Sequence, residues 1–274
     1  MSFVASDLSY SVGASSLLRA VTINLQAGEL HVVIGPNGSG KSTLLKLLSG
    51  ELRPQQGTIT LNQKPLSQWT ALEQAQQRAV LPQNDHLNFS FASEQVVALG
   101  RMPCRQQSPQ QEQAIVREAL KATDALHLAQ RDYLTLSGGE RARVQLARIL
   151  AQVWEPINFG PRYLLLDEPT ANLDLAHQHL CLQLARTFVS QNAGALVILH
   201  DPNLALMYAD RVTLLCCGEV IAAGTPLEVL TAQNLARVYG VRVELMKSAT
   251  TNQPYIVVET IGAETAPQIK KDRD

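Results

Sequence analysis

The chain has few of the residues that mark specialised classes of protein. Only 5% of its 274 residues are aromatic, and 23 basic residues are balanced by 24 acidic ones, which gives a net charge of −1. Such a balance lacks the basic surface that nucleic-acid binding requires, so we expect no nucleic-acid partner. The sequence contains no apolar run of about 18 residues or more and no charged-then-apolar leader, so we expect neither a membrane span nor a signal peptide.

Cysteine is also scarce. The four cysteines (Cys104, Cys181, Cys216 and Cys217) form no C-x-x-C pair, and we expect them to be reduced, mostly buried thiols of a cytosolic protein. The length and a hydrophobic content of 46% suffice for one large α/β domain with a sizeable core.

The most informative segment is the phosphate-binding pattern G-x-x-x-x-G-K-[ST]. It consists of Gly35, Pro36, Asn37, Gly38, Ser39, Gly40, Lys41, Ser42 and Thr43. An apolar run at 30–34 precedes it as a predicted buried strand, and leucines at helical spacing follow it, which is the context the pattern requires. We expect Lys41 to reach the β- and γ-phosphates of a nucleoside triphosphate and the Ser42 hydroxyl to ligate Mg²⁺.

Two further predicted strands end in residues that suit phosphate chemistry. The run 162–168 ends in Asp167 and Glu168, at the edge where open α/β sheets bind ligands. Asp167 suits a Mg²⁺ shell, and Glu168 is placed to polarise an attacking water. A strand at 195–199 ends in His200, whose imidazole can hydrogen-bond the γ-phosphate and that water together. We predict no metal site at His177, because the other nearby histidine lies two positions away on a helix and faces elsewhere.

With these motifs in order, the chain resembles an ABC-transporter ATPase subunit over about residues 3–240. The resemblance implies that Tyr10 stacks on adenine and that Gln83, in Leu-Pro-Gln-Asn, acts as a further catalytic and metal-binding residue. Residues 136–140, Leu-Ser-Gly-Gly-Glu, match the signature loop, with Glu where Gln is also common, and residues 171–174 match the D-loop, although Ser-Ala-Leu-Asp is more usual there. Because no essential position is lost, an active ATPase is implied.

The signature loop (residues 136–140) also has a physical interpretation. Ser137 followed by Glu140 is a capping-box pattern at the start of a helix, and a helix N-terminus is also an anion site. In the resembled family this site faces the γ-phosphate held by the opposite subunit. Ser137, Gly138, Gly139 and Asp174 are therefore expected to contact ATP in trans, within a homodimer.

The expected fold class is a mixed α/β P-loop NTPase core with two additions. Residues 3–11, 17–25 and 57–64 are predicted strands of an N-terminal antiparallel β subdomain, and residues 84–152 are a predicted inserted helical subdomain with an exposed Gln-rich stretch at 105–113. Parallel strands start near 163, 195 and 212, and 241–245 with 255–259 predict a closing hairpin. Residues 1–262 then form one ABC ATP-binding domain, and the tail 263–274 is expected to be disordered.

Phe89 and Phe91 leave two interpretations open. They pack beneath the helical subdomain, or they form a groove that receives a helix of a membrane permease. In the resembled family this region contacts the permease, which favours docking to two permease copies and, indirectly, to a periplasmic substrate-binding protein. The protein is then peripheral on the cytoplasmic face of the bacterial inner membrane.

The sequence indicates the transported cargo less directly than it indicates the ATPase. The 30 positions from Ser137 to Asp167 are several more than in most of the family, and residues 151–162 and 174–178 are similar to the hemin-import ATPases (the HmuV type) of type II bacterial importers. Ferric siderophore or cobalamin import is the alternative. A non-transport ABC ATPase acting on DNA or ribosomes is a second class. Its chromosome-associated forms carry long coiled coils between the two motifs, whereas here only about ninety residues intervene, with no sustained heptads.

Overall fold

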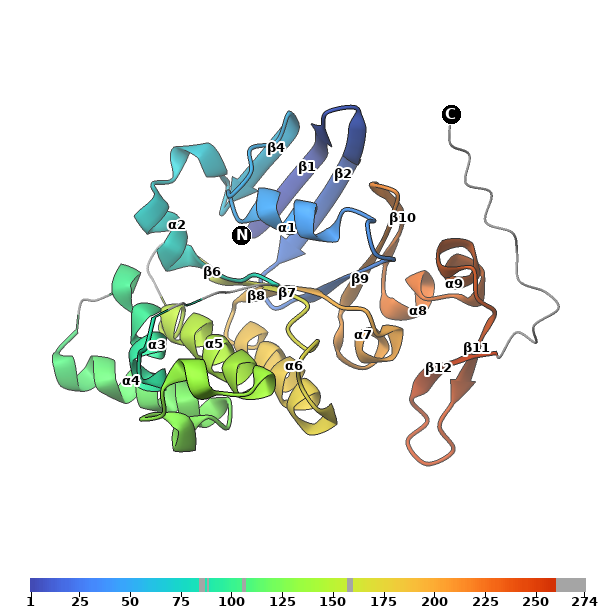
Figure 1. The fold of residues 1–274 in the computed structure, drawn as a ribbon. Helices are drawn as coiled ribbons and strands as arrows, with labels where there is room; N and C mark the ends of the chain where they lie inside the picture. The colour runs from blue at the N-terminus through green and yellow to red at the C-terminus, as the bar shows by residue number, and fades with distance from the viewer. Residues whose placement is uncertain (84–86, 88, 105–106, 157–159, 260–274) are drawn as a thin grey trace.

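A six-stranded sheet forms the centre of the fold. The computed structural model describes residues 1–83, 87, 89–104, 107–156 and 160–259 (Figure 1). Within this part of the chain the strand order is β10-β9-β3-β8-β7-β6. The strands are β3 (Leu30–Ile34), β6 (Arg78–Leu81), β7 (Tyr163–Asp167), β8 (Gly194–Ile198), β9 (Arg211–Cys216) and β10 (Glu219–Gly224). All pair in parallel except β10, and β3, β7 and β8 are buried at every residue, as expected for strands covered on both faces.

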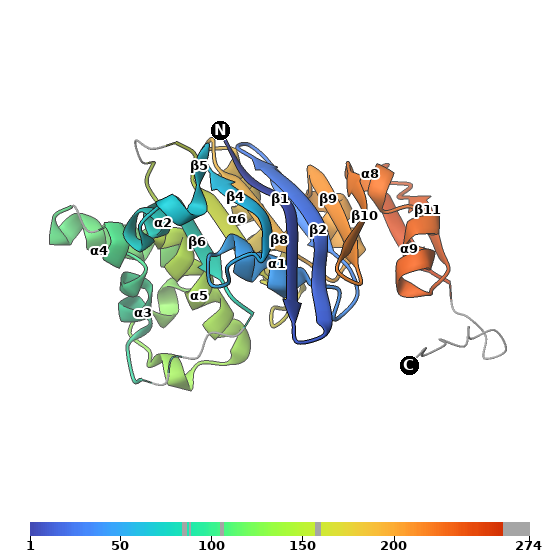
Figure 2. The same ribbon diagram turned by 90° about the horizontal axis from the view of Figure 1, so that it is seen from above.

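An antiparallel sheet covers one face of this core. It contains β1 (Ser2–Val12), β2 (Ser15–Gln26), β4 (Gln56–Leu61) and β5 (Lys64–Pro65). Helix α1 (Lys41–Leu48) packs with it and with one face of the central sheet in a single hydrophobic cluster (Figure 2). The prediction of one strand over 57–64 is wrong at its end. Asn62 and Gln63 have φ of 49° and 68° and turn the chain back between β4 and β5.

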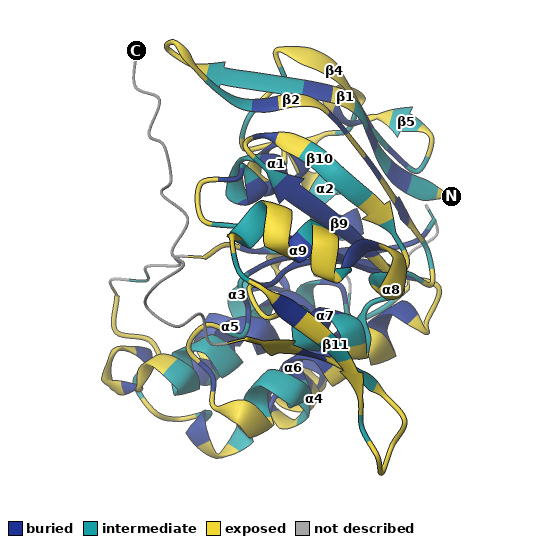
Figure 3. Ribbon diagram, turned by 90° about the vertical axis from the view of Figure 1, so that its right-hand side faces the viewer, coloured by how far each residue is buried: buried dark blue, intermediate teal, exposed yellow. Residues whose placement is uncertain are grey.

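Helices and a hairpin cover the opposite face. These elements are α6 (Leu175–Val189), α7 (Pro202–Tyr208), α8 (Pro226–Val229), α9 (Ala232–Tyr239), β11 (Val243–Lys247) and β12 (Pro254–Val258). They share a second cluster with the other side chains of β3, β7 and β8. Figure 3 shows this side, where β9 is buried and β10 beside it is mostly half-buried. The predicted closing hairpin is confirmed by the antiparallel pairing of β11 with β12.

The helical subdomain has a core of its own. It consists of α3 (Ser93–Leu99), α4 (Pro109–Ala122) and α5 (Gly138–Gln152), with short 3-10 helices at Met102–Cys104, Leu126–Leu128 and Tyr133–Thr135. Helix α2 (Ala71–Gln77) and the 3-10 helix Leu66–Gln68 precede β6. The predicted helical segment is therefore confirmed from Ser93 onward, and α4 already begins inside the expected Gln-rich loop. Three parts of the predicted helical segment (residues 84–86, 88 and 105–106) lie outside the described residues. The same holds for residues 157–159, within the segment 151–162 that is similar to hemin-import ATPases, and for the predicted tail.

The expectation of mostly buried thiols is only partly correct. Cys181 is buried on α6, Cys104 and Cys216 are half-buried, and Cys217 is exposed. Cys217 lies in the turn between β9 and β10 with φ of 50°, where the hairpin reaches solvent. Among the described residues, no helix is both long and apolar enough to cross a membrane.

Candidate functional site

The phosphate loop (Gly35–Thr43) connects β3 to α1, as the sequence predicts. Its glycine-rich backbone needs left-handed conformations, with φ of 77° at Gly38 and 103° at Gly40. A Cβ atom at Gly40 would lie 2.6 Å from the carbonyl oxygen of Leu17, so a side chain there would collide with β2. The loop thus presents backbone and a helix N-terminus, the combination that suits an anion.

Lys41 lies at the centre of the loop and is nearly buried. Its Nζ donates hydrogen bonds to the carbonyl oxygens of Gly35 at 2.8 Å and Pro36 at 2.9 Å. Burial lowers the pKa of Lys41, and the neighbouring charges of Glu168 and Asp167 oppose this effect. The ammonium group is therefore held inside the loop where a phosphate would be received.

Three residues predicted to be catalytic meet at one carboxylate. Glu168 Oε1 lies 2.5 Å from His200 Nε2, and Gln83 Nε2 donates to Glu168 Oε2 at 2.9 Å. These residues follow the C-terminal ends of β7, β8 and β6, which are adjacent in the sheet. Glu168 has φ of 51°, an unfavourable conformation for a residue with a side chain, which costs on the order of 1–3 kcal/mol. The parallel sheet thus gathers an amide, an imidazole and a carboxylate that can accept a proton.

Asp167 is buried beside the phosphate loop. Burial raises the pKa of Asp167 above its usual value, and a hydrogen bond from the Ser42 hydroxyl opposes that effect. Its Oδ1 is buried and has no hydrogen-bond partner in the described part of the chain. An unpaired carboxylate oxygen next to a hydroxyl fits a hard divalent cation. The described residues contain no cluster of three or more His, Cys, Asp or Glu that could hold a metal ion.

A cavity of about 390 Å³ joins most of these groups. It is lined by Leu17, Asn37, Gly38, Ser39, Gly40, Lys41, Ser42, Thr43, Gln83, Glu168 and His200. Tyr10 does not line it; the ring is half-buried on β1 and packs against the antiparallel-sheet cluster. Gly35 and Pro36 do not line it either, and their carbonyl oxygens accept hydrogen bonds from Lys41. The phosphate end of the predicted site is therefore assembled within one chain.

The signature loop lies elsewhere. Gly138 lines a second cavity of about 240 Å³, which Gln83, Asp167 and Glu168 also border from the other side. Ser137 caps α5: its hydroxyl accepts from the backbone N–H of Glu140 at 3.3 Å, and the Glu140 carboxylate accepts from the Ser137 N–H at 2.7 Å. The capping box is confirmed. None of Ser137, Gly138, Gly139 and Asp174 lines the cavity at the phosphate loop.

Sequence reasoning missed two contributors to the phosphate loop. Leu17 lines its cavity from β2, and the backbone N–H of Gly218 donates to the carbonyl oxygen of Ser39 at 3.0 Å. Neither belongs to a motif, and both reach the loop only through tertiary contact. The turn after β9 thus supports the loop from behind.

The sequence model of the family described as "ABC transporter" matches residues 18–171, more than half of the chain. The chain belongs to the ABC transporter family. It is an ATP-binding subunit of that family, an ATPase whose activity is coupled to transport.

Individual relatives of this ABC ATPase are similar over nearly their whole length. The hemin import ATP-binding protein HmuV of Myxococcus xanthus is 47% identical, covering 90% of this chain and 93% of its own. The protein of the same name from Pseudomonas aeruginosa is also 47% identical, covering 92% and 97%. Among solved structures, an inward-facing putative metal-chelate type ABC transporter aligns with a TM-score of 0.77 at 26% identity, covering 94% and 97%.

Proposed function

We propose that this chain is the ATPase subunit of a hemin importer. The observation that carries the proposal is the 47% identity to the hemin import protein of M. xanthus over 93% of that protein. A ferric siderophore or cobalamin importer is the second candidate, supported by the structural likeness to a metal-chelate type transporter. A net charge of −1 disfavours a nucleic-acid partner. We further propose that residues 1–262 act as one ATP-binding domain.

In this proposal ATP is the substrate and the phosphate loop holds its phosphates. The loop Gly35–Thr43 wraps the phosphates with the backbone N–H groups of its residues other than Pro36, Lys41 neutralises phosphate charge, and Tyr10 stacks on adenine. The position of Tyr10 outside the phosphate cavity is compatible with contact to the far, adenine end of the nucleotide. Mg²⁺, held by Ser42, Asp167 and Gln83, would polarise the phosphate oxygens.

Hydrolysis is assigned to the three residues that meet at Glu168. The carboxylate of Glu168 accepts a proton from water as the water oxygen bonds to the γ-phosphorus and the bond to the ADP oxygen breaks. His200 Nε2 contacts the γ-phosphate and orients that water, and Gln83 holds the second oxygen of Glu168. Their distances of 2.5 and 2.9 Å support this arrangement.

A second copy completes the site. We propose that Ser137, Gly138, Gly139 and Asp174 contact the ATP held by the partner subunit of a homodimer. Two observations support this: these residues do not line the phosphate cavity of their own chain, and the N-terminus of α5 offers N–H donors to an anion.

Coupling to the membrane is assigned to the segment after Gln83. The Phe89 side chain is 70% exposed and Phe91 37%, which supports docking to a permease rather than packing beneath the helices. We propose a complex with two permease copies, fed by a periplasmic substrate-binding protein. The chain then lies peripherally on the cytoplasmic face of the bacterial inner membrane.

Uptake by proteoliposomes tests the cargo. The ATPase is reconstituted with its permease, and ATP-dependent uptake of hemin, a ferric siderophore and cobalamin is compared. We expect hemin uptake that the Glu168→Gln variant abolishes. Uptake of only a siderophore or of cobalamin would replace hemin as the cargo, and association with nucleic acid instead of membranes would overturn the transport function.

A further inference from the structure

The signature loop and the D-loop (Ala171–Asp174) of one chain touch each other. A Cβ atom on Gly139 would lie 3.1 Å from the carbonyl oxygen of Asn172, and Gly138 and Asn172 line the same cavity. The first loop belongs to the helical subdomain and the second follows β7 of the core. Any contact that fixes one subdomain against the other therefore also fixes the spacing between these loops.

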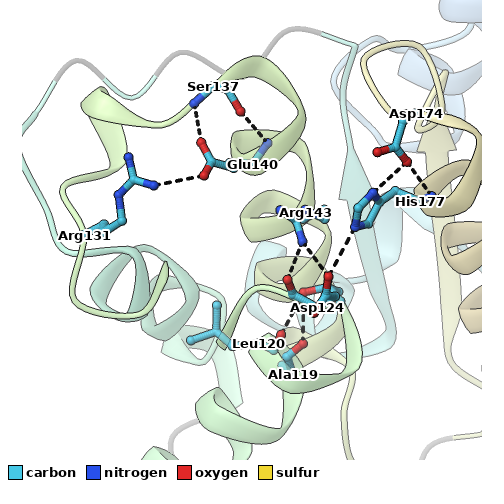
Figure 4. Close-up of polar contacts among 10 residues, drawn as sticks. Ala119, Leu120, Asp124, Arg131, Ser137, Glu140, Arg143, Asp174 and His177 are labelled. Carbon is cyan, nitrogen blue, oxygen red and sulfur yellow. Dashed lines mark hydrogen bonds and ion pairs between the residues drawn. The ribbon is translucent and has the colours of Figure 1, made fainter. Parts of the chain in front are cut away.

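His177 makes such a contact. It lies in the first turn of α6, just after the D-loop, and is three-quarters buried (Figure 4). Its Nδ1 lies 2.7 Å from Asp174 Oδ1, and its Nε2 lies 3.3 Å from Asp124 Oδ2. Asp124 belongs to the turn that follows α4 in the helical subdomain. One imidazole thus bridges the D-loop and the helical subdomain.

The same bridge continues to the helix that carries the signature loop. Arg143 of α5 pairs with Asp124 Oδ2 at 3.1 Å and also donates to the backbone oxygen of Asp124. Asp174, which caps α6 through the backbone N–H of His177 at 2.9 Å, has a lowered pKa because of hydrogen bonds from His177, with a smaller contribution from Arg143. Among the described residues, the charged groups around the imidazole are therefore Asp174, Asp124 and Arg143 (Figure 4).

The chemistry of the bridge depends on protonation. Both ring nitrogens face carboxylate oxygens, and a neutral imidazole has only one N–H to donate. Its other nitrogen would present a lone pair to an acceptor. Only the imidazolium donates to Asp174 and Asp124 together, so the doubly protonated ring makes the complete bridge.

We propose that His177 is a positioning residue that holds the D-loop and the signature loop in the arrangement each subunit presents to its partner. This inference rests on the proposed function, because both loops act in trans there. Without the bridge, Asp174 keeps its cap on α6, but the helical subdomain can move relative to it. The consequence is a weaker ATP-bound dimer and slower turnover, with ATP binding by the single chain unchanged.

ATP-driven dimerisation tests the proposal. The dissociation constant of the dimer is measured by analytical ultracentrifugation in the Glu168→Gln background, with and without His177→Ala. We expect dimerisation about tenfold weaker, as for loss of one charge-assisted hydrogen bond, and an equal affinity of monomer for a fluorescent ATP analogue. His127→Ala, which changes an exposed histidine of the helical subdomain, is the control and should not change either value.

A double-mutant cycle separates positioning from folding. His177→Ala and Asp124→Asn should be non-additive in dimerisation, with thermal midpoints that do not account for the loss. Unchanged dimerisation in His177→Ala, additive effects, or an equal effect of His127→Ala would overturn the inference while leaving the importer function intact. Failure of the Glu168→Gln parent to dimerise with ATP would instead count against the proposed shared site.

Discussion

The phosphate loop and the signature loop, both proposed to hold an anion, are built in opposite ways. The phosphate loop consists of nine consecutive residues between a buried strand and a helix, and Glu168 of the same chain lines its cavity. The signature loop is a capped helix end, and the cavity beside it is bordered by Gly138 together with Gln83, Asp167 and Glu168. The comparison teaches that one half of the site is a local property of the sequence, whereas the other half depends on how whole subdomains are placed.

The two regions are also stabilised differently. Around the phosphate loop, β3, β7 and β8 bury side chains on both faces, which is a large hydrophobic contribution. The helical subdomain has a separate core, and it is joined to the central sheet both by apolar side chains of α5 (Leu146, Ile149 and Leu150) and by polar contacts such as Gln152 Nε2 to the carbonyl oxygen of Ala75 at 2.7 Å. The polar contacts of this junction can be rearranged with less loss of buried area than the apolar ones.

The largest expected effect concerns the phosphate-loop side of the site, which one chain forms by itself. Glu168→Gln should keep ATP binding and reduce hydrolysis by at least about 100-fold, because the amide cannot accept the proton from water. Steady-state phosphate release and ATP-dependent dimer formation measure both properties. Glu118→Gln, an exposed carboxylate on α4, is the control. Normal hydrolysis in Glu168→Gln would remove Glu168 from the role of base.

A smaller effect concerns the stability of the helical subdomain. Arg101 is 2% exposed and pairs with Glu112 at 2.7 Å and Glu155 at 3.2 Å, while also donating to the carbonyl oxygen of Ala151 at 2.8 Å. Arg101→Met should lower the free energy of unfolding of the helical subdomain by about 2–3 kcal/mol, because two carboxylates lose their partner. Hydrogen exchange should rise in α3, α4 and α5 and stay low in β3, β7 and β8.

The control for that experiment is Arg117→Met, an exposed arginine on α4. It should leave the exchange rates of both regions unchanged. If Arg101→Met accelerated exchange equally in the central sheet, the two regions would unfold as one unit and the contrast between them would be lost.

The smallest effect is a gain of stability at the site. Burial raises the pKa of Asp167, so the native state binds its proton more tightly than the unfolded chain does. Stability therefore falls as pH rises from about 3.8, the unfolded value, through the folded pKa, and it stays lowered at neutral pH. Asp167→Asn removes this cost and should make the nucleotide-free protein more stable at pH 7.

Urea unfolding at pH 7 and at lower pH measures this difference. The advantage of Asp167→Asn should shrink as the pH falls towards 3.8, and the variant should lose Mg²⁺-dependent hydrolysis. A variant less stable than the parent at pH 7 would mean that the carboxylate, although buried, is held by favourable contacts.

What the sequence could predict follows the same division. The phosphate loop, the acidic strand end and the capping box are local patterns, so their elements could be placed from neighbouring residues. The placement of His200 near Glu168 followed from the edge at which parallel strands end, whereas Gln83 was expected there only from the resemblance to ABC-transporter ATPases. The contact between His177 and Asp124 joins residues 53 positions apart, and no local rule specifies it. The turn at Asn62 was missed although three consecutive polar residues at 62–64 (Asn, Gln, Lys) end the alternation of apolar and polar residues that runs to Leu61.

Helix α5 carries one further consequence. Its C-terminal end is fastened by Arg101 at Ala151 and by Gln152 at the carbonyl oxygens of Ala75 and Arg78, while its N-terminal end carries the signature loop. A helix of 15 residues is about 22 Å long. It therefore acts as a lever pivoted near the edge strand β6: a tilt of about 10° at the pivot would carry the far end through about 4 Å, more than the length of one hydrogen bond.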